Sequence, residues 1–151
     1  MEFQYPCGKE AVEAVLPHRD PFVWVTRVLA CDAGSTIHAQ LDVDPDLPLF
    51  KGHFPDHPVL PGVIIMEALA QTASFCILVD RGAQGALGFL TGIDKAKFRR
   101  QVAPGETLDL KATIVKASSR LCVAEVEASV DGQLCASATQ KYVLAHAADE
   151  Q

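Results

Sequence analysis

The chain has 151 residues, 49% of them hydrophobic, and a formal net charge of −6. This length predicts a single domain, residues 1–151, and this composition excludes an intrinsically disordered chain. The acidic balance argues against a nucleic-acid-binding protein, because phosphates call for a basic face.

The cysteines and the first residues bear on the compartment. The five cysteines are scattered and no two are spaced as C-x-x-C, so we interpret them as reduced thiols that mostly fill the core. Residues 1–6, Met-Glu-Phe-Gln-Tyr-Pro, have neither a basic start nor an apolar run and do not resemble a signal peptide. We therefore expect a cytoplasmic protein.

Three elements are predicted in the first third of the chain. Residues 8–15 could form a short amphipathic helix that ends at Pro17. Residues 22–29 are rich in β-branched and aromatic side chains, which predicts a strand. Residues 37–44 alternate between apolar and polar side chains, which predicts a half-exposed strand. Between these elements, we interpret His18 as a hydrogen-bonded structural residue.

Residues 52–62, Gly-His-Phe-Pro-Asp-His-Pro-Val-Leu-Pro-Gly, form a stiff segment that carries a histidine. Each of its three prolines fixes its own φ and pushes the preceding residue toward extended backbone. His53 and His57 are spaced as a metal-binding pair on a helix would be, but the prolines exclude a helix there. We therefore expect no metal site.

Residues 63–79 are apolar almost all round, which is typical of a buried helix. We reject a membrane span, because four polar residues interrupt a run that is only just long enough: Glu67, Gln71, Thr72 and Ser74. Pro61 suits the first helical position, where its missing N–H is no loss.

Glu67 is the one carboxylate in this helix, and Gln71 is its expected polar neighbour, four residues on. Carboxylates are rarely buried unless paired. Burial favours the protonated form of a carboxyl group, which can donate a proton. The alternative is a half-exposed glutamate near the helix start, where the helix dipole favours negative charge.

The start of the helix is a candidate oxyanion site. No Ser, Thr, Asp or Asn stands just before Pro61 to cap the free N–H groups. Gly62 lacks a Cβ, so another molecule can approach its backbone closely. A histidine base on the loop, a carboxylic acid on the helix and backbone donors between them suit α-proton abstraction with loss of a β-hydroxyl from a thioester.

The second half of the chain reads as consecutive strands. We predict strands over residues 87–100, bent near Gly92, and over 107–115, 121–130 and 134–144. A loop is predicted at 81–85, a tight hairpin at Asp131-Gly132 and a frayed tail over 145–151. One long helix among such strands predicts an α+β fold, an antiparallel sheet curved around the helix. Such a sheet leaves edges that a dimer could pair.

Several motifs together resemble the hot-dog-fold 3-hydroxyacyl-[acyl carrier protein] dehydratases of type II fatty acid synthesis, in their dehydratase-only branch. The resemblance rests on Gly52-His53-Phe54-Pro55, Pro61-Gly62-Val63, Glu67-Ala68 and Ala70-Gln71. Flanking matches are Leu16-Pro17-His18-Arg19, Gly92-Ile93-Asp94, Lys97-Phe98-Arg99-Arg100 and Pro104-Gly105. The chain departs from the family pattern at Asp20, Thr26 and Gln101.

The resemblance implies a role for each site residue. His53 is the catalytic histidine and Glu67 the catalytic acid, while the Gly62 N–H binds the thioester carbonyl. The Val59 carbonyl orients His53, and Gln71 positions Glu67. The site is shared across a dimer interface, with the histidine from one subunit and the acid from the other, and uses no cofactor.

The partners follow from the same resemblance. The substrate is a 3-hydroxyacyl chain on acyl carrier protein, from fatty acid or a related synthesis such as that of aryl polyenes. Lys95, Lys97, Arg99 and Arg100 are a candidate docking patch for this acidic carrier, although a solvated charged face is the alternative. We expect a homodimer or a dimer-based oligomer, with a heterodimer with a paralogue as an alternative.

Two other functions remain open on the sequence alone. A hot-dog acyl thioesterase shares the fold and the thioester substrate, and a non-catalytic acyl-thioester-binding subunit would share the fold. The proline-bound His53 suits proton abstraction better than hydrolysis. Retention of both His53 and Glu67 argues against a non-catalytic subunit.

Overall fold

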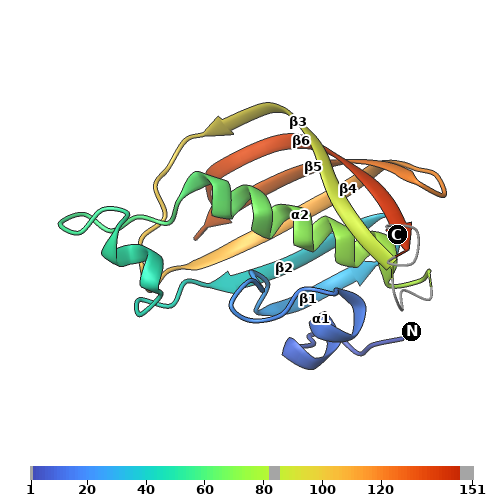
Figure 1. Ribbon diagram of the computed structural model, residues 1–151, viewed down its shortest axis with the longest axis horizontal. Helices are drawn as coiled ribbons and strands as arrows, with labels where there is room; N and C mark the ends of the chain where they lie inside the picture. The colour runs from blue at the N-terminus through green and yellow to red at the C-terminus, as the bar shows by residue number, and fades with distance from the viewer. Residues whose placement is uncertain (1, 82–85, 147–151) are drawn as a thin grey trace.

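A six-stranded antiparallel sheet wraps around one long helix in the computed structural model, which describes residues 2–81 and 86–146 (Figure 1). The strand order is β1-β2-β4-β5-β6-β3. The predicted hot-dog fold is therefore confirmed, including the short N-terminal helix. The elements in chain order are α1 Lys9–Val15, β1 Arg27–Asp32, β2 Thr36–Asp42, the 3-10 helix η1 Pro48–Lys51, α2 Gly62–Leu78, β3 Ala86–Phe98, β4 Thr107–Ala117, β5 Leu121–Val130 and β6 Gln133–His146.

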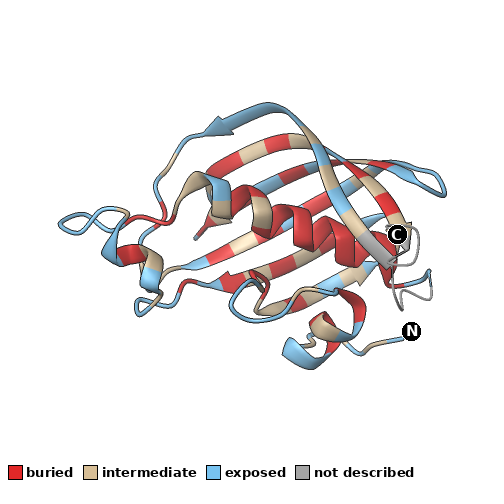
Figure 2. Cartoon of the chain, in the orientation of Figure 1, coloured by how far each residue is buried: buried red, intermediate tan, exposed pale blue. Residues whose placement is uncertain are grey.

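Helix α2 is buried along most of its length, as its apolar sequence predicts (Figure 2). From Ile65 to Leu78 every residue is buried except Glu67. The first turn is more open, because Gly62 and Ile64 are partly exposed and Val63 is 75% exposed. Among the described residues, no helix is long and apolar enough to cross a membrane.

The strands bury one face against α2 and expose the other. In β4, Leu108, Leu110 and Ala112 are buried while Asp109 and Lys111 lie on the opposite face. The hairpin between β5 and β6 turns at Asp131 and Gly132, whose φ angles are 49° and 81°. Two consecutive positive φ angles are what a two-residue hairpin loop requires, so the predicted hairpin is confirmed.

The two edges of the sheet differ. An isolated bridge between Cys7 and Val28 covers part of the β1 edge with the N-terminal segment. At the other end of the strand order, β3 pairs with β6 on one side and with no strand of the described chain on the other. Along β3, Phe89, Ile93 and Phe98 are 42%, 40% and 55% exposed. The open edge therefore carries exposed apolar side chains and has no strand partner within the described chain.

The structure corrects several element boundaries. The predicted strand 22–29 begins only at Arg27, because the backbone at residues 22–24 bonds to a helix side chain instead of to a strand. The predicted tail begins too early, since β6 continues to residue 146. The bend predicted near Gly92 is present as a register shift between residues 90 and 92. The loop predicted at 81–85 and the end of the tail, 147–151, lie largely outside the described residues.

Candidate active site

His53 lies on the loop between η1 and α2, and two backbone contacts fix it. Its own N–H donates to the Leu49 carbonyl at 3.0 Å, and its carbonyl accepts from the Val59 N–H at 3.1 Å. The His53 ring also stacks on Phe54, with ring centroids 4.3 Å apart. Phe54 is 54% exposed, so this pair lies at the surface of the single chain.

The His53 ring has one defined proton arrangement. Its Nδ1 lies 3.0 Å from the Val59 carbonyl oxygen. A carbonyl oxygen can only accept, so Nδ1 must carry the hydrogen in this contact. In the neutral ring Nε2 then has a lone pair and can accept a proton. The backbone of Val59 thus sets His53 up as a base.

The His53 loop is fastened to the turn that follows β3. His57 Nε2 lies 3.0 Å from Gln101 Oε1, and the Leu60 N–H donates to the Val102 carbonyl at 2.8 Å. That turn is itself held by an ion pair between Arg100 and Glu106 at 2.7 Å. The Arg100 guanidinium, through its hydrogen bonds, is the main cause that lowers the pKa of Glu106 below its usual range.

Helix α2 begins without a side-chain cap. Pro61 occupies the N-cap position, and its carbonyl accepts from the N–H groups of Ile64 and Ile65 at 3.0 and 3.2 Å. The N–H groups of Gly62 and Val63 have no hydrogen-bond partner within the described chain. Two free donors at the positive end of a helix can bind a negatively charged oxygen.

The Phe98 ring approaches the backbone of Gly62 closely. A Cβ at residue 62 would lie 2.7 Å from Phe98 Cε1, well inside van der Waals contact. The Phe98 ring comes from the end of β3 and is 55% exposed. It therefore packs over the start of α2 with one side exposed to solvent.

Glu67 is anchored through one of its two oxygens. Gln71 Nε2 donates to Glu67 Oε2 at 2.9 Å, whereas Oε1 has no hydrogen-bond partner among the described residues. The Glu67 side chain is 25% exposed, so it is neither fully buried nor half exposed. The free oxygen is the one that can exchange a proton with a bound molecule.

Gln71 is in turn fixed by a segment remote in sequence. Its Oε1 accepts the Trp24 N–H at 2.8 Å, and its Nε2 also donates to the Phe22 carbonyl at 3.1 Å. Gln71 is only 1% exposed. The segment ahead of β1 therefore holds the amide that holds Glu67.

His18 is a neighbour of Glu67 that the sequence interpretation left out of the site. Its Nε2 lies 3.7 Å from Glu67 Oε2. Its Nδ1 is buried with no hydrogen-bond partner, so the predicted structural hydrogen bond of His18 is wrong for this atom. Its place next to Leu16-Pro17 in the motif 16–19 was the only sequence signal for such a contact.

The structure does not join the two halves of the predicted site within one chain. His53 contacts Val59 and Phe54, while Glu67 contacts Gln71 and His18. Among the described residues, His53 and Glu67 share neither a hydrogen bond nor an ion pair. Each chain thus presents the predicted base and the predicted acid as two separate groups.

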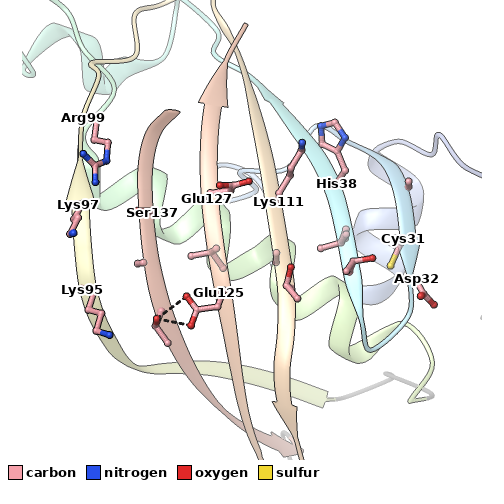
Figure 3. Close-up of a pocket in the computed structure, with 18 residues that line it drawn as sticks. Cys31, Asp32, His38, Lys95, Lys97, Arg99, Lys111, Glu125, Glu127 and Ser137 are labelled. Carbon is pink, nitrogen blue, oxygen red and sulfur yellow. Dashed lines mark hydrogen bonds between the residues drawn. The ribbon is translucent and has the colours of Figure 1, made fainter. Parts of the chain in front are cut away.

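Three of the four predicted docking cations lie together and the fourth does not. Lys95, Lys97 and Arg99 line one side of a groove on the face of the sheet turned away from α2 (Figure 3). None of the three has an acidic partner within the described chain. Arg100 instead bonds Glu106 and Gln133 in the turn after β3.

The described residues contain no candidate metal-binding cluster. No group of three or more His, Cys, Asp or Glu side chains among residues 2–81 and 86–146 is arranged to hold a metal ion. All five cysteines are free thiols, three buried and two partly exposed.

Comparison with protein families matches most of the chain. The model of a FabA-like domain matches residues 16–139. A 3-hydroxyacyl-[acyl-carrier-protein] dehydratase FabZ from Streptococcus pneumoniae is 45% identical over 135 residues, which are 89% of this chain and 96% of the relative. The protein of the same name from Streptococcus pyogenes is 47% identical over 128 residues, 85% of this chain and 91% of the relative. The Oceanobacillus iheyensis protein of that name is 40% identical over 129 residues, 85% and 92% of the two chains.

Solved structures share the fold. A chain of the dehydratase heterocomplex ApeI:P from Xenorhabdus doucetiae superposes with a TM-score of 0.79 at 20% identity, covering 98% of this chain and 96% of that one. The PaaI protein of Escherichia coli superposes with a TM-score of 0.61 at 14% identity, covering 77% and 80%. At these identities the likeness shows the architecture alone.

Proposed function

The chain belongs to the FabA-like family, and from this premise we propose that it is a 3-hydroxyacyl-[acyl-carrier-protein] dehydratase with His53 as base and Glu67 as acid. The assignment of these two residues rests on one observation: each side chain has one polar atom held by a hydrogen bond and one polar atom free to exchange a proton. His53 has a free Nε2 because Val59 holds Nδ1, and Glu67 has a free Oε1 because Gln71 holds Oε2.

The reaction follows from these two free atoms. His53 Nε2 removes a proton from the carbon next to the thioester carbonyl. The free N–H groups at the start of α2, from Gly62 and Val63, bind the negative charge that develops on the carbonyl oxygen. Glu67 Oε1 gives its proton to the β-hydroxyl as the carbon–oxygen bond breaks, and water leaves. The product is a trans-2-enoyl thioester. His53 then releases its extra proton and Glu67 takes one up, which restores the site for the next turnover.

The first experiment follows product type with a 3-hydroxyacyl thioester. Wild type should form the enoyl absorbance without releasing free thiol, and His53→Ala and Glu67→Gln should each lose about 100-fold or more in kcat, as removal of a general base or acid does. Free thiol in place of the enoyl product would identify a thioesterase. A folded wild type that forms neither product, across several chain lengths on a carrier, would indicate a binding subunit.

We further propose that the active site is shared across a homodimer formed through the open edge of β3. An unpaired strand edge is a template for pairing with another chain, and the exposed Phe89, Ile93 and Phe98 would be covered there. Because Phe98 also touches Gly62, this edge ends at the start of α2. Pairing of two such edges would bring a second chain's loop toward this chain's helix. A heterodimer with a paralogue would satisfy the same geometry.

Subunit mixing tests the shared site. When His53→Ala and Glu67→Gln chains are unfolded together and refolded, half of the dimers should contain both chains. Each mixed dimer has one site with both wild-type residues, so about a quarter of wild-type activity should return. Refolding each variant alone is the control. A mixture as inactive as its parts would place base and acid in the same chain.

We also propose that Lys95, Lys97 and Arg99 attract the acidic carrier protein. On the neighbouring strands Glu127 faces Lys111 in register. Lys97 instead faces Ser137 on β6, and none of the three cations has an acidic partner within the described chain. Reversal at Lys97 and Arg99 should raise KM for the carrier-bound substrate about tenfold and leave a short thioester unaffected. Lys116→Glu, an exposed reversal on β4, is the matched control. Equal effects on both substrates would contradict the docking role.

The free cysteines bear on the cellular compartment of the enzyme. Five free cysteines are typical of a reducing compartment. We therefore propose a cytoplasmic enzyme.

A further inference from the structure

We propose that His18 is a positioning residue for the acid: as a neutral imidazole it donates Nε2–H to Glu67 Oε2 and, with Gln71, keeps the transferable proton on Oε1. This inference rests on the proposed function, which assigns Glu67 as the acid. The role of His18 is argued from the contacts of the Glu67 carboxyl group alone.

Two donors converge on the same oxygen. Gln71 Nε2 donates to Glu67 Oε2 at 2.9 Å, and His18 Nε2 lies 3.7 Å from that same atom. An oxygen that accepts from two N–H groups is a poor place for a proton, because a hydroxyl hydrogen there would face two other hydrogens. The proton of the neutral acid therefore belongs on Oε1, which shares no hydrogen bond or ion pair with a described residue.

His18 is built to stay neutral. Its Nδ1 is buried without a partner, so an imidazolium would bury an N–H donor that has no acceptor. Burial is the main cause that lowers the pKa of His18 below its usual range; Glu67 opposes this effect and Arg19 adds to it. The Arg19 charge is itself shared with Glu13 on α1, at 3.5 Å. With Nδ1 unprotonated, the single hydrogen of the neutral ring is on Nε2, the atom that faces Glu67.

The separation of 3.7 Å suits an interaction that strengthens during the reaction. It is longer than a hydrogen bond in the free protein, and such contacts often shorten when charge develops. Transfer of the Oε1 proton to the leaving hydroxyl converts Glu67 to a carboxylate. A neutral donor stabilises this carboxylate as it forms. An ion pair would instead favour the ionised acid before the reaction and remove the proton that the reaction needs.

The segment that carries His18 also fixes Gln71. His18 follows α1, and Phe22 and Trp24 bond the Gln71 amide a few residues later. One stretch, residues 18–24, thus supplies both the direct neighbour of Glu67 and the support of its second donor. A purely structural histidine would not need to face the carboxyl group.

Two substitutions separate a neutral donor from the alternatives. His18→Gln places an amide Nε2–H near the position of the imidazole Nε2–H but cannot titrate near neutrality, and His18→Ala removes the donor. We expect His18→Ala to lose about tenfold in kcat with little change in KM, a part of what a general acid contributes. His18→Gln should stay within about threefold of wild type. His38→Gln is the matched control, because His38 pairs with Asp109 at 2.8 Å on the opposite face of the sheet.

A double-mutant cycle provides a readout that a packing role would not change. If His18 acts through the Glu67 acid, His18→Ala should lower kcat in the wild-type background but add nothing in a Glu67→Gln background. A packing role would lower kcat by the same factor in both backgrounds.

A spectroscopic measurement keeps this inference distinct from the proposed function. With 13C-labelled glutamate, the Glu67 side-chain resonance, assigned by its loss in Glu67→Gln, should move in folded His18→Ala and stay close to wild type in His18→Gln, whether or not the protein turns over substrate. An inactive wild type with this difference would end the proposed function and leave the His18–Glu67 coupling intact. An unchanged resonance in His18→Ala, or a His18→Gln variant that folds but is as impaired as His18→Ala, would overturn the inference.

Discussion

The loop that carries His53 and the helix that carries Glu67 are positioned by opposite means. The loop, residues 52–61, is mostly exposed, and its histidine is held by backbone atoms of Leu49 and Val59, which are close in sequence. Helix α2 is buried, and its glutamate is held by Gln71, whose partners are some 47 residues away. Contacts with residues close in sequence thus orient His53, the proposed base, and the tertiary fold orients Glu67, the proposed acid.

This contrast predicts that a substitution of Gln71, which holds Glu67, lowers the stability of the fold as well as the activity. Gln71→Met removes three hydrogen bonds and leaves the Trp24 N–H buried without an acceptor. We expect a loss of roughly 2–4 kcal/mol in the free energy of unfolding and of about 100-fold in kcat. Urea denaturation and steady-state kinetics measure the two effects.

Gln101→Met is the matched control on the loop side, because it removes only the bond between His57 and Gln101. An exposed bond of this kind should cost less than about 1 kcal/mol. Equal losses of stability in the two variants would break the comparison.

Gly62 joins the loop of residues 52–61 to helix α2. Gly62→Ala should reduce activity without lowering the stability of the fold. The new Cβ would lie 2.7 Å from Phe98 Cε1 and would crowd the free N–H groups. Alanine is the better helix former by up to about 1 kcal/mol, so the melting temperature should not fall. We expect about a tenfold loss in kcat/KM from weakened binding of the oxyanion.

The double variant Gly62→Ala with Phe98→Leu distinguishes the two causes of this loss. If displacement of the Phe98 ring is responsible, the shorter side chain should restore part of the activity. No recovery would indicate that the alanine methyl itself blocks the donors.

A substitution in the loop should lower both stability and activity less than the substitution of Gln71 does. Pro58→Ala frees the backbone next to Val59, whose carbonyl orients the His53 ring. The loss of stability should be about 0.4–1 kcal/mol, through the greater freedom of the unfolded chain. We expect kcat to fall about threefold as His53 spends more time misoriented. Pro104→Ala, in the turn after β3, should show the stability effect without the kinetic one.

The smallest effect is expected at the Arg100–Glu106 pair, which holds the turn under the loop. Arg100 lowers the pKa of Glu106, so the pair stabilises the fold above the unfolded glutamate pKa of about 4.3 and loses this contribution as the pH falls below it. Arg100→Gln should cost at most about 1 kcal/mol at pH 7 and progressively less at acidic pH, as Glu106 becomes protonated. Arg99→Gln, which breaks no ion pair, is the control; a pH-independent loss at Arg100 would point to packing.

The sequence predicts locally determined features well. Alternating residues predicted most of the strands, the apolar run predicted α2 and the pair Asp131-Gly132 predicted its hairpin, because each depends on neighbouring residues. The contact between His53 and the Val59 carbonyl lies within one short loop. Its implied role, like that of Glu67, stays a prediction until the variants are measured.

Features that depend on distant partners were the ones missed. Phe22 to Trp24 have strand-forming side chains, but their backbone groups bond Gln71 on α2, a choice made by the tertiary fold. Arg100 follows three cations of one strand, yet its guanidinium finds Glu106 across a turn. The burial of His18 Nδ1 beside Glu67 likewise depends on how residues 18–24 fold onto the helix.

The missing cap of α2 links substrate affinity to the stability of the fold. Pro61 offers no side chain to the first free N–H groups, and a cap of the usual kind contributes about 1 kcal/mol. The bound thioester oxygen would complete the helix in its place, so the free enzyme forgoes stability that the substrate restores on binding. Pro61→Ser would supply an internal competitor for the same donors. A substitution at residue 61 that raises thermal stability would therefore lower turnover. The trade-off between stability and activity is confined to the first turn of α2.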